Sequence, residues 1–108
     1  MIEVDQQPLV SVVISSYNHA PYIEASIESV LAQSYANLEL LVVDDGSSDD
    51  SVERIRTLQA KHGFDFVVQE NKGLAATLND CIARSHGSLI APFGSDDIMC
   101  PERIAIQV

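Results

Sequence analysis

The chain has 108 residues, 46% of them hydrophobic, which allows one domain with a modest core. Its 16 acidic residues outnumber its 6 basic ones, so its surface potential argues against binding to nucleic acid or anionic lipid. Cys81 and Cys100 form no CxxC pair, so neither a zinc site nor a disulfide framework is indicated.

Residues 1–8 are polar and acidic, and no stretch of the sequence reaches membrane-spanning length. A reducing cytoplasm fits the cysteine usage best. The cytoplasmic face of a membrane stays open as the location of the full-length protein. The acidic excess has two readings, namely solubility and a set of carboxylates that hold a divalent cation.

Apolar runs rich in β-branched residues predict strands over residues 9–15, 38–43, 64–68 and 88–93. Helical spacing of apolar residues predicts a helix from Pro21 to about Gln33. A second helix carries Val52, Ile55 and Leu58 and ends near Gly63, and a third covers residues 73–85. A last helix is expected to open at Pro101.

Some details of the helices also follow from the sequence. Asp50 and Glu53 have the spacing of a capping box at the start of the second helix, and Asp49 is given no role beyond capping. The third helix is expected to turn an inner face of Leu74, Leu78 and Ile82 to the sheet, where Cys81 also packs. The three histidines are expected at the surface: His19, His62 and His86.

Strands that alternate with helices imply right-handed βαβ crossovers. The predicted fold is therefore α/β, an open and mainly parallel sheet with helices on both faces. Because Val108 falls within the last predicted helix, the fold is expected to be truncated there. An apolar edge or face left uncovered would favour a homo-oligomer.

Polar residues follow each predicted strand, and in an open α/β sheet the carboxyl ends of the strands form the ligand-binding edge. The residues expected to meet there are Ser15, Tyr17, Asn18, Asp44, Asp45, Asn71, Lys72, Asp96 and Asp97. Four clustered carboxylates repel one another unless a hard cation such as Mg²⁺ or Mn²⁺ compensates them. Such a cation suits a diphosphate ligand, whereas no P-loop and no dinucleotide-binding glycine pattern occurs.

Several motifs, taken in order along the chain, resemble those of family 2 glycosyltransferases of the GT-A fold. They are VSVVISSYN (residues 10–18), SVLAQ (29–33), ELLVVDDGS (39–47), NKG (71–73), Asn79 and SDD (95–97). The resemblance covers nearly the whole chain. It implies a Rossmann-like half of that fold, with residues 1–8 as a tail and residues 9–108 as a nucleotide-diphospho-sugar-binding domain that is incomplete at its C-terminus.

The resemblance also implies roles for single residues. Ser15 and Tyr17 line the nucleoside pocket, and Tyr17 stacks on the base. Asp45 recognises the base edge, commonly that of uracil, while Asp44 supports its loop. Asn18 and Lys72 are further nucleotide-binding candidates, with Lys72 near the diphosphate.

The motif at residues 95–97 matches the family's metal and ribose motif. Asp96 and Asp97 would share the contacts to Mn²⁺ or Mg²⁺ and to the ribose. Many members carry an aspartate where this chain has Gly94, which leaves fewer metal ligands.

The predicted function is transfer of a sugar from a nucleoside diphosphate sugar to an acceptor hydroxyl on a glycan, lipid or protein. The donor is expected to be a UDP-sugar. The resemblance implies an inverting, metal-dependent, hexosyltransferase-like reaction. The family places its catalytic base in a half that lies beyond residue 108. The chain alone is therefore expected to bind donor without transferring sugar.

Two alternatives stay open from the sequence. A signalling receiver domain has similar length and clustered acids, but its acidic pair follows the first strand and its phosphorylated aspartate the third. Here the acids follow the second and fourth strands. The other alternative is a non-catalytic interaction module of the same fold.

Overall fold

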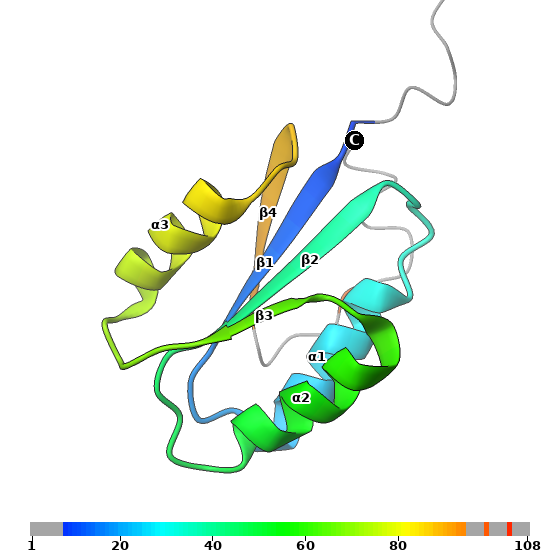
Figure 1. The fold of residues 1–108 in the computed structure, drawn as a ribbon. Coiled ribbons are helices and arrows are strands. Elements are labelled where there is room, and N and C mark those ends of the chain that lie inside the picture. Colours follow the sequence, from blue (N-terminus) through cyan, green and yellow to red (C-terminus); the bar gives the residue numbers. More distant parts are fainter. Residues whose placement is uncertain (1–7, 95–98, 100–103, 105–108) are drawn as a thin grey trace, which may run out of the picture.

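The computed structural model describes residues 8–94 together with Met99 and Ile104. Four strands and three helices alternate along this part of the chain (Figure 1). In chain order they are β1 (Val10–Ser16), α1 (Ala20–Leu31), β2 (Leu38–Asp44), α2 (Ser51–His62), β3 (Asp65–Val68), α3 (Leu74–Arg84) and β4 (Leu89–Gly94). These bounds agree within two residues with those expected from the sequence for all four strands.

The strands form one parallel sheet in the order β3-β2-β1-β4. This arrangement confirms the predicted open α/β fold. The order corresponds to the first four strands of the doubly wound 3-2-1-4-5-6 sheet, and it differs from the 2-1-3-4-5 order of receiver domains. The receiver alternative is therefore wrong.

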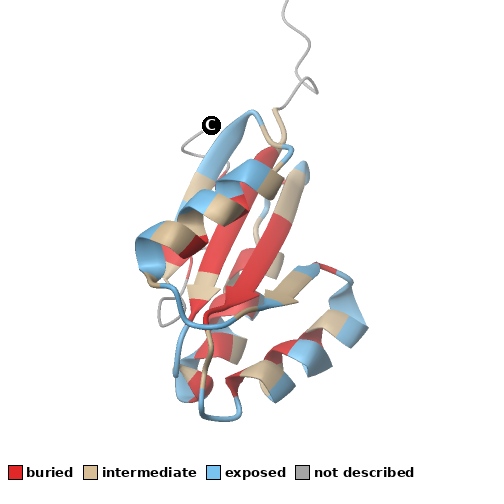
Figure 2. Cartoon of the chain, turned by 60° about the vertical axis from the view of Figure 1, so that its left-hand side comes forward, coloured by how far each residue is buried: buried red, intermediate tan, exposed pale blue. Residues whose placement is uncertain are grey.

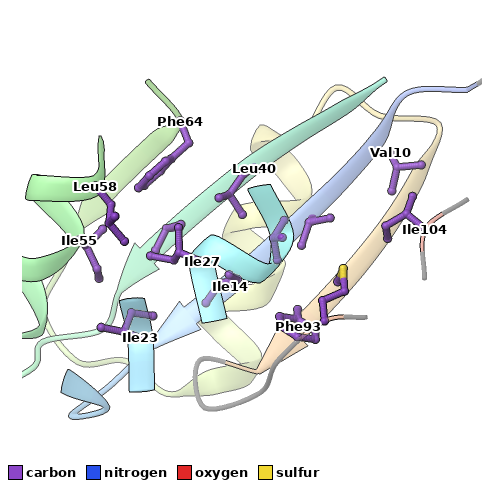
Figure 3. Packing of buried hydrophobic residues seen from close by; sticks show 14 of the residues in the cluster. Val10, Ile14, Ile23, Ile27, Leu40, Ile55, Leu58, Phe64, Phe93 and Ile104 are labelled. Atoms are coloured by element: carbon purple, nitrogen blue, oxygen red, sulfur yellow. The ribbon is translucent and has the colours of Figure 1, made fainter. Parts of the chain in front are cut away.

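Helices cover both faces of the sheet, with α1 and α2 on one side and α3 on the other (Figure 1). The central strands β1 and β2 are buried along most of their length, as Figure 2 shows. The larger core lies under α1 and α2, where Ile14, Ile27 and Ile55 are fully buried (Figure 3). The smaller core lies under α3 and consists of Val13, Leu41, Val43 and Cys81.

The face that α3 turns to the sheet differs from the expected one. Cys81 is fully buried, as predicted, and so is Thr77, whereas Leu74 is 63% exposed and Ile82 is 44% exposed. Residues 77 and 81 lie one position, or about 100° of helical rotation, away from the predicted stripe. Small side chains at these two positions let α3 pack closely on β1, and Leu78 is partly buried at the margin of the contact.

The predicted capping box at the start of α2 is also wrong. The Asp50 side chain caps no backbone N–H, and its carboxylate pairs with Arg54 Nε at 3.1 Å. The neighbouring Asp49 accepts hydrogen bonds from the Ser51 N–H at 3.0 Å and from the Ala20 N–H at 3.1 Å. Asp49 thereby ties the start of α2 to the start of α1.

A hydrogen-bonded cluster holds the amino ends of the strands. Glu39 Oε1 accepts hydrogen bonds from the Ser11 hydroxyl at 2.5 Å and from the His86 N–H at 2.7 Å, and Ser11 Oγ accepts the Gly87 N–H at 2.8 Å. A Cβ on Gly87 would lie 2.7 Å from Ser11 N and 2.8 Å from Leu9 O, so only glycine fits there. Burial raises the pKa of Glu39, but hydrogen bonds from His86 and Ser11 outweigh it and lower the pKa overall.

No helix among the described residues combines the length and the apolar character that a membrane crossing requires.

Ile55 and Ile82 offer a matched test of which helix faces form the core, because the former is fully buried and the latter is 44% exposed. We expect Ile55→Ala to lower the free energy of unfolding by about 2–5 kcal/mol. We expect Ile82→Ala to lower it by less than about 1 kcal/mol, since nearly half of its surface is already in contact with solvent and less packing is lost. Urea denaturation followed by circular dichroism measures both, and equal losses would contradict the assignment of the α3 face.

Candidate nucleotide-binding cleft

The loops that follow β1, β2 and β3 meet at the carboxyl edge of the sheet, as Figure 1 shows. A cleft of about 330 Å³ opens between them. Its lining comes from the end of β1, the β1–α1, β2–α2 and β3–α3 loops and the first residue of α3, and comprises Ser15, Tyr17, His19, Asp45, Asn71, Gly73 and Leu74. Four of the residues that the sequence predicted to meet at this edge therefore share one cleft, namely Ser15, Tyr17, Asp45 and Asn71.

Asp45 is the most enclosed polar residue of this cleft, with only 3% of its surface exposed. Its Oδ1 atom accepts hydrogen bonds from Gln69 Nε2 at 3.0 Å and from the Lys72 N–H at 2.9 Å. Its Oδ2 atom accepts the Gly73 N–H at 3.0 Å. The carboxylate thus closes the loop between β3 and α3 around itself.

These contacts keep Asp45 ionised. Burial raises the pKa of the carboxyl, but hydrogen bonds from Gln69, Lys72 and Gly73, with a further contribution from the Thr77 hydroxyl, outweigh it and hold the pKa below its usual value. A carboxylate in this state accepts hydrogen bonds and donates none. The cleft therefore presents a fixed negative acceptor.

Gly46 allows the two loops to approach each other. Its φ of +83° lies in the left-handed region, and a Cβ there would lie 2.8 Å from Asn71 N. Across this close approach, Asn71 Nδ2 donates to the backbone carbonyl of Asp45 at 3.1 Å. The Asp-Gly pair thus places the Asp45 side chain beside the backbone that holds it.

Asp44 lies next to Asp45 in the chain but faces its own turn. Its Oδ2 atom accepts the Ser47 N–H at 2.8 Å, and its Oδ1 atom accepts the Ser47 hydroxyl at 2.6 Å. The residue is fully buried. Asp44 therefore stabilises the turn after β2 and is not among the residues that line the cleft in the described part of the chain.

Asn18 joins the first two loops. It adopts a φ of 53°, a conformation that asparagine tolerates better than most residues. Its N–H donates to Ser47 Oγ at 2.9 Å, and its Oδ1 atom accepts the Ser48 N–H at 2.8 Å. These contacts fix the direction of the loop that carries Tyr17 and His19.

Aromatic and apolar side chains form the rest of the wall. The Tyr17 side chain is about half exposed and lines the cleft, and the His19 ring lies edge-on to Tyr22 with ring centres 6.4 Å apart. Leu74 and Ser15 also border a second hollow of about 210 Å³. Sequence reasoning expected His19 only at the surface, whereas the structure places it partly buried in the cleft wall.

Lys72 contributes its backbone to the site, and its side chain has another partner. The Nζ atom pairs with Asp80 Oδ2 at 2.5 Å, and both side chains are about half exposed. In the described structure the ammonium group therefore contacts α3, while its predicted proximity to a diphosphate stays a prediction.

The metal ligands predicted from the sequence, Asp96 and Asp97, lie outside the described residues. Within residues 8–94, 99 and 104, no group of three or more His, Cys, Asp or Glu side chains could hold a metal ion. Asp44 and Asp45 are compensated by hydrogen bonds from the protein. Four carboxylates were expected to share a cation. For Asp44 and Asp45, hydrogen-bond donors of the protein compensate the negative charge.

Comparison with known proteins places this chain in a family. The sequence model of glycosyl transferase family 2 matches residues 11–108. The putative glycosyltransferase EpsE of Bacillus subtilis (strain 168) is 41% identical over 105 residues, which cover 94% of this chain and 37% of that protein. The chondroitin synthase of Escherichia coli is 35% identical over 100 residues, which cover 92% of this chain and 15% of that protein. The chain thus spans well under half the length of these relatives.

Two solved structures with a similar fold were determined with a nucleotide or nucleotide sugar bound. The mannosyltransferase PcManGT from Pyrobaculum calidifontis, solved in complex with GDP-Man and Mn²⁺, matches with a TM-score of 0.80 and 27% identity over 94% of this chain and 31% of its own. S. aureus TarS in complex with UDP matches with a TM-score of 0.83 over 92% of this chain and 30% of its own. At 23% identity, this likeness to TarS shows the fold alone.

Asp45→Asn tests the role of the ionised carboxylate in closing the loops. An asparagine that offers its amide nitrogen cannot accept from the N–H groups of Lys72 and Gly73, so we expect about 1.5–3 kcal/mol less stability at pH 7. Because the folded-state pKa of Asp45 lies below its unfolded value, its contribution is complete above the unfolded pKa and is lost as the pH falls through the folded pKa. Urea denaturation between pH 7 and pH 3 measures this change.

The difference in free energy of unfolding between wild type and Asp45→Asn should therefore become smaller as the pH falls. Asp50→Asn is the matched control, because Asp50 is exposed and pairs only with Arg54 at the surface of α2 among the described residues. A gap that stays constant down to pH 3 would contradict the proposed charge dependence.

Proposed function

The chain belongs to glycosyl transferase family 2, and on that premise we propose that its cleft binds the nucleotide of a nucleoside diphosphate sugar. The sugar would be transferred to an acceptor hydroxyl. The observation that carries this proposal is the buried, ionised Asp45 carboxylate in the wall of a cleft that also contains the exposed ring of Tyr17. A planar base can stack on the tyrosine while its edge reaches the carboxylate.

The hydrogen bonds of Asp45 support uracil as the base. A carboxylate offers about four acceptor positions, and in the described part of the chain the donors within hydrogen-bond distance, Gln69, Lys72 and Gly73, occupy three of them. The remaining capacity matches one N–H donor. Uracil presents a single N–H on its pairing edge, between two carbonyl groups, whereas guanine presents two adjacent donors that require two acceptors. We therefore propose a UDP-sugar as donor.

We further propose that a divalent cation, Mn²⁺ or Mg²⁺, binds the diphosphate through Asp96 and Asp97. Asp44 and Asp45 are committed to protein donors, which leaves the acidic pair after β4 to supply the carboxylate ligands. The Mn²⁺ in the PcManGT complex supports the choice of ion. When bound, such a cation would neutralise the charge on the departing nucleoside diphosphate.

The transfer itself needs a general base for the acceptor hydroxyl, and we propose an inverting displacement. Asp45 is unsuited to act as that base, because its lowered pKa and its hydrogen bonds make it a weak proton acceptor. We propose that the 108-residue chain binds donor without transferring its sugar. Turnover of a defined acceptor by this chain would contradict that proposal.

The first experiment is a calorimetric or NMR titration with UDP, GDP and 3-methyluridine diphosphate. We expect UDP to bind more tightly than GDP. The 3-methyl group removes the N–H that Asp45 would accept, so that analogue should lose about tenfold in affinity, the equivalent of one charge-assisted hydrogen bond. This arm of the test leaves the protein unchanged, so a folding defect cannot produce the result.

Asp45→Ala should bind UDP and its 3-methyl analogue with equal affinity, because the group that distinguishes them is gone. Asp50→Ala serves as the control and should keep the wild-type difference. Tighter binding of GDP than of UDP would overturn the uracil assignment, and failure of all three nucleotides to bind would overturn the proposed function.

Metal dependence has its own test. We expect Mn²⁺ to raise UDP affinity by about tenfold or more and EDTA to reverse the gain. Asp97→Ala should lose this response to Mn²⁺ and still discriminate UDP from its 3-methyl analogue, because base recognition belongs to Asp45. UDP affinity that is the same with Mn²⁺ and with EDTA would contradict the proposal.

A further inference from the structure

Among the described residues, three donors lie within hydrogen-bond distance of the Asp45 carboxylate, and the one that comes from a side chain is Gln69, a residue outside every motif that indicated the function. Resting on the proposed recognition of a base by Asp45, we propose that Gln69, held by Thr77, is the positioning and specificity-determining residue of the cleft. Gln69 orients the Asp45 carboxylate and leaves it room to accept a hydrogen bond from one N–H group of the base.

Gln69 is fixed at both ends. Its backbone N–H donates to the Asp44 carbonyl at 3.0 Å, which continues the pairing of β3 with β2 by one residue. Its side-chain amide donates to Asp45 Oδ1 at 3.0 Å and to Thr77 Oγ1 at 2.8 Å. Both protons of the amide are therefore used, which defines the orientation of the group.

Thr77 supplies a rigid support for this amide. It is fully buried on the face of α3 that packs on the sheet, one helical turn before Cys81. A hydroxyl at this buried position requires a hydrogen-bond partner, and the Gln69 amide provides one. A line of contacts thus runs from the inner face of α3 through Gln69 to the carboxylate in the cleft.

The two carboxylate oxygens of Asp45 accept different numbers of hydrogen bonds. Oδ1 accepts two hydrogen bonds, from Gln69 and Lys72, whereas Oδ2 accepts one, from Gly73. Without Gln69 each oxygen would keep one backbone donor and have room for one more. The carboxylate could then accept two adjacent donors, as the guanine edge offers. Gln69 therefore favours a base with one N–H over a base with two.

The variants are Gln69→Leu, which keeps the approximate size of the side chain and removes the amide, and the pair Thr77→Val and Thr77→Ser. Valine keeps the shape of threonine without its hydroxyl, and serine keeps the hydroxyl. The first readout is the pKa of Asp45, followed by ¹³C NMR of its carboxyl in the full 108-residue chain without ligand. The second is the ratio of UDP to GDP affinity.

We expect Gln69→Leu to raise the pKa of Asp45, because it removes the largest of the hydrogen bonds that lower it. Thr77→Val should raise this pKa as well, because the Thr77 hydroxyl both supports the Gln69 amide and itself contributes to lowering the pKa, and Thr77→Ser, which keeps the hydroxyl, should stay close to wild type. UDP affinity should fall about tenfold in Gln69→Leu and Thr77→Val, while GDP affinity falls less, so the ratio of UDP to GDP affinity decreases.

An unchanged pKa of Asp45 in both Gln69→Leu and Thr77→Val would overturn the positioning role, whatever the nucleotides do. A raised pKa with an unchanged ratio of affinities would overturn the specificity role. If the wild-type chain binds no nucleotide, the proposed function fails, and the ligand-free NMR titration still decides whether Gln69 and Thr77 hold the carboxylate. Should Gln69→Leu fail to fold, the two Thr77 variants carry the same test.

Discussion

The carboxylate of Asp45 and the donors that surround it hold this end of the molecule together. Two backbone N–H groups and one side-chain amide point at it from the segment between β3 and α3, and its own backbone carbonyl accepts from Asn71. That segment has no regular structure of its own, so its direction depends on these contacts. The Asp45 carboxylate thus has two roles, because it positions the wall of the cleft on the α3 side and is also the charge that the cleft presents to a ligand.

Burying a charge in this way is costly unless donors replace the lost water. Here the donors are backbone amides at the start of α3, reinforced by Gln69. The partial positive charge of a helix N-terminus acts in the same direction. Glu39 repeats the principle at the opposite edge, where Ser11 and the His86 N–H replace water. The sheet is thus held at both ends by carboxylates whose pKa values are lowered, and stability at both ends depends on their ionisation.

The sequence was informative where a single periodicity decides the structure. The β-branched runs predicted the four described strands, and the rule that loops meet at the carboxyl edge predicted that Ser15, Tyr17, Asp45 and Asn71 lie at one edge, where the structure places them in one cleft. It was uninformative where two patterns compete. In α3 the burial of Cys81 was predicted, but the spacing of Leu74, Leu78 and Ile82 indicated the wrong centre for the inner face, and the smaller Thr77 is buried where the helix packs on the sheet.

The partners of the carboxylates were not predictable for a related reason. Hydrogen bonds between loops depend on backbone geometry, such as the left-handed conformation of Gly46 and the position of Asn71 against it, and not on the spacing of residue types. Gln69 and Thr77 are polar residues of ordinary appearance in the sequence. Their spacing of eight residues across a loop and a helix turn gives no periodic signal.

A carboxylate that is already oriented by the protein has a consequence for binding. A ligand that meets it need not order the loop or desolvate a mobile charge, so the entropic and desolvation costs of recognition are largely met on folding. The same preorganisation makes the cleft intolerant, because an acceptor held by three donors cannot turn to suit a second kind of base edge. Selectivity at this edge of the sheet thus follows from the hydrogen bonds that fold the loop.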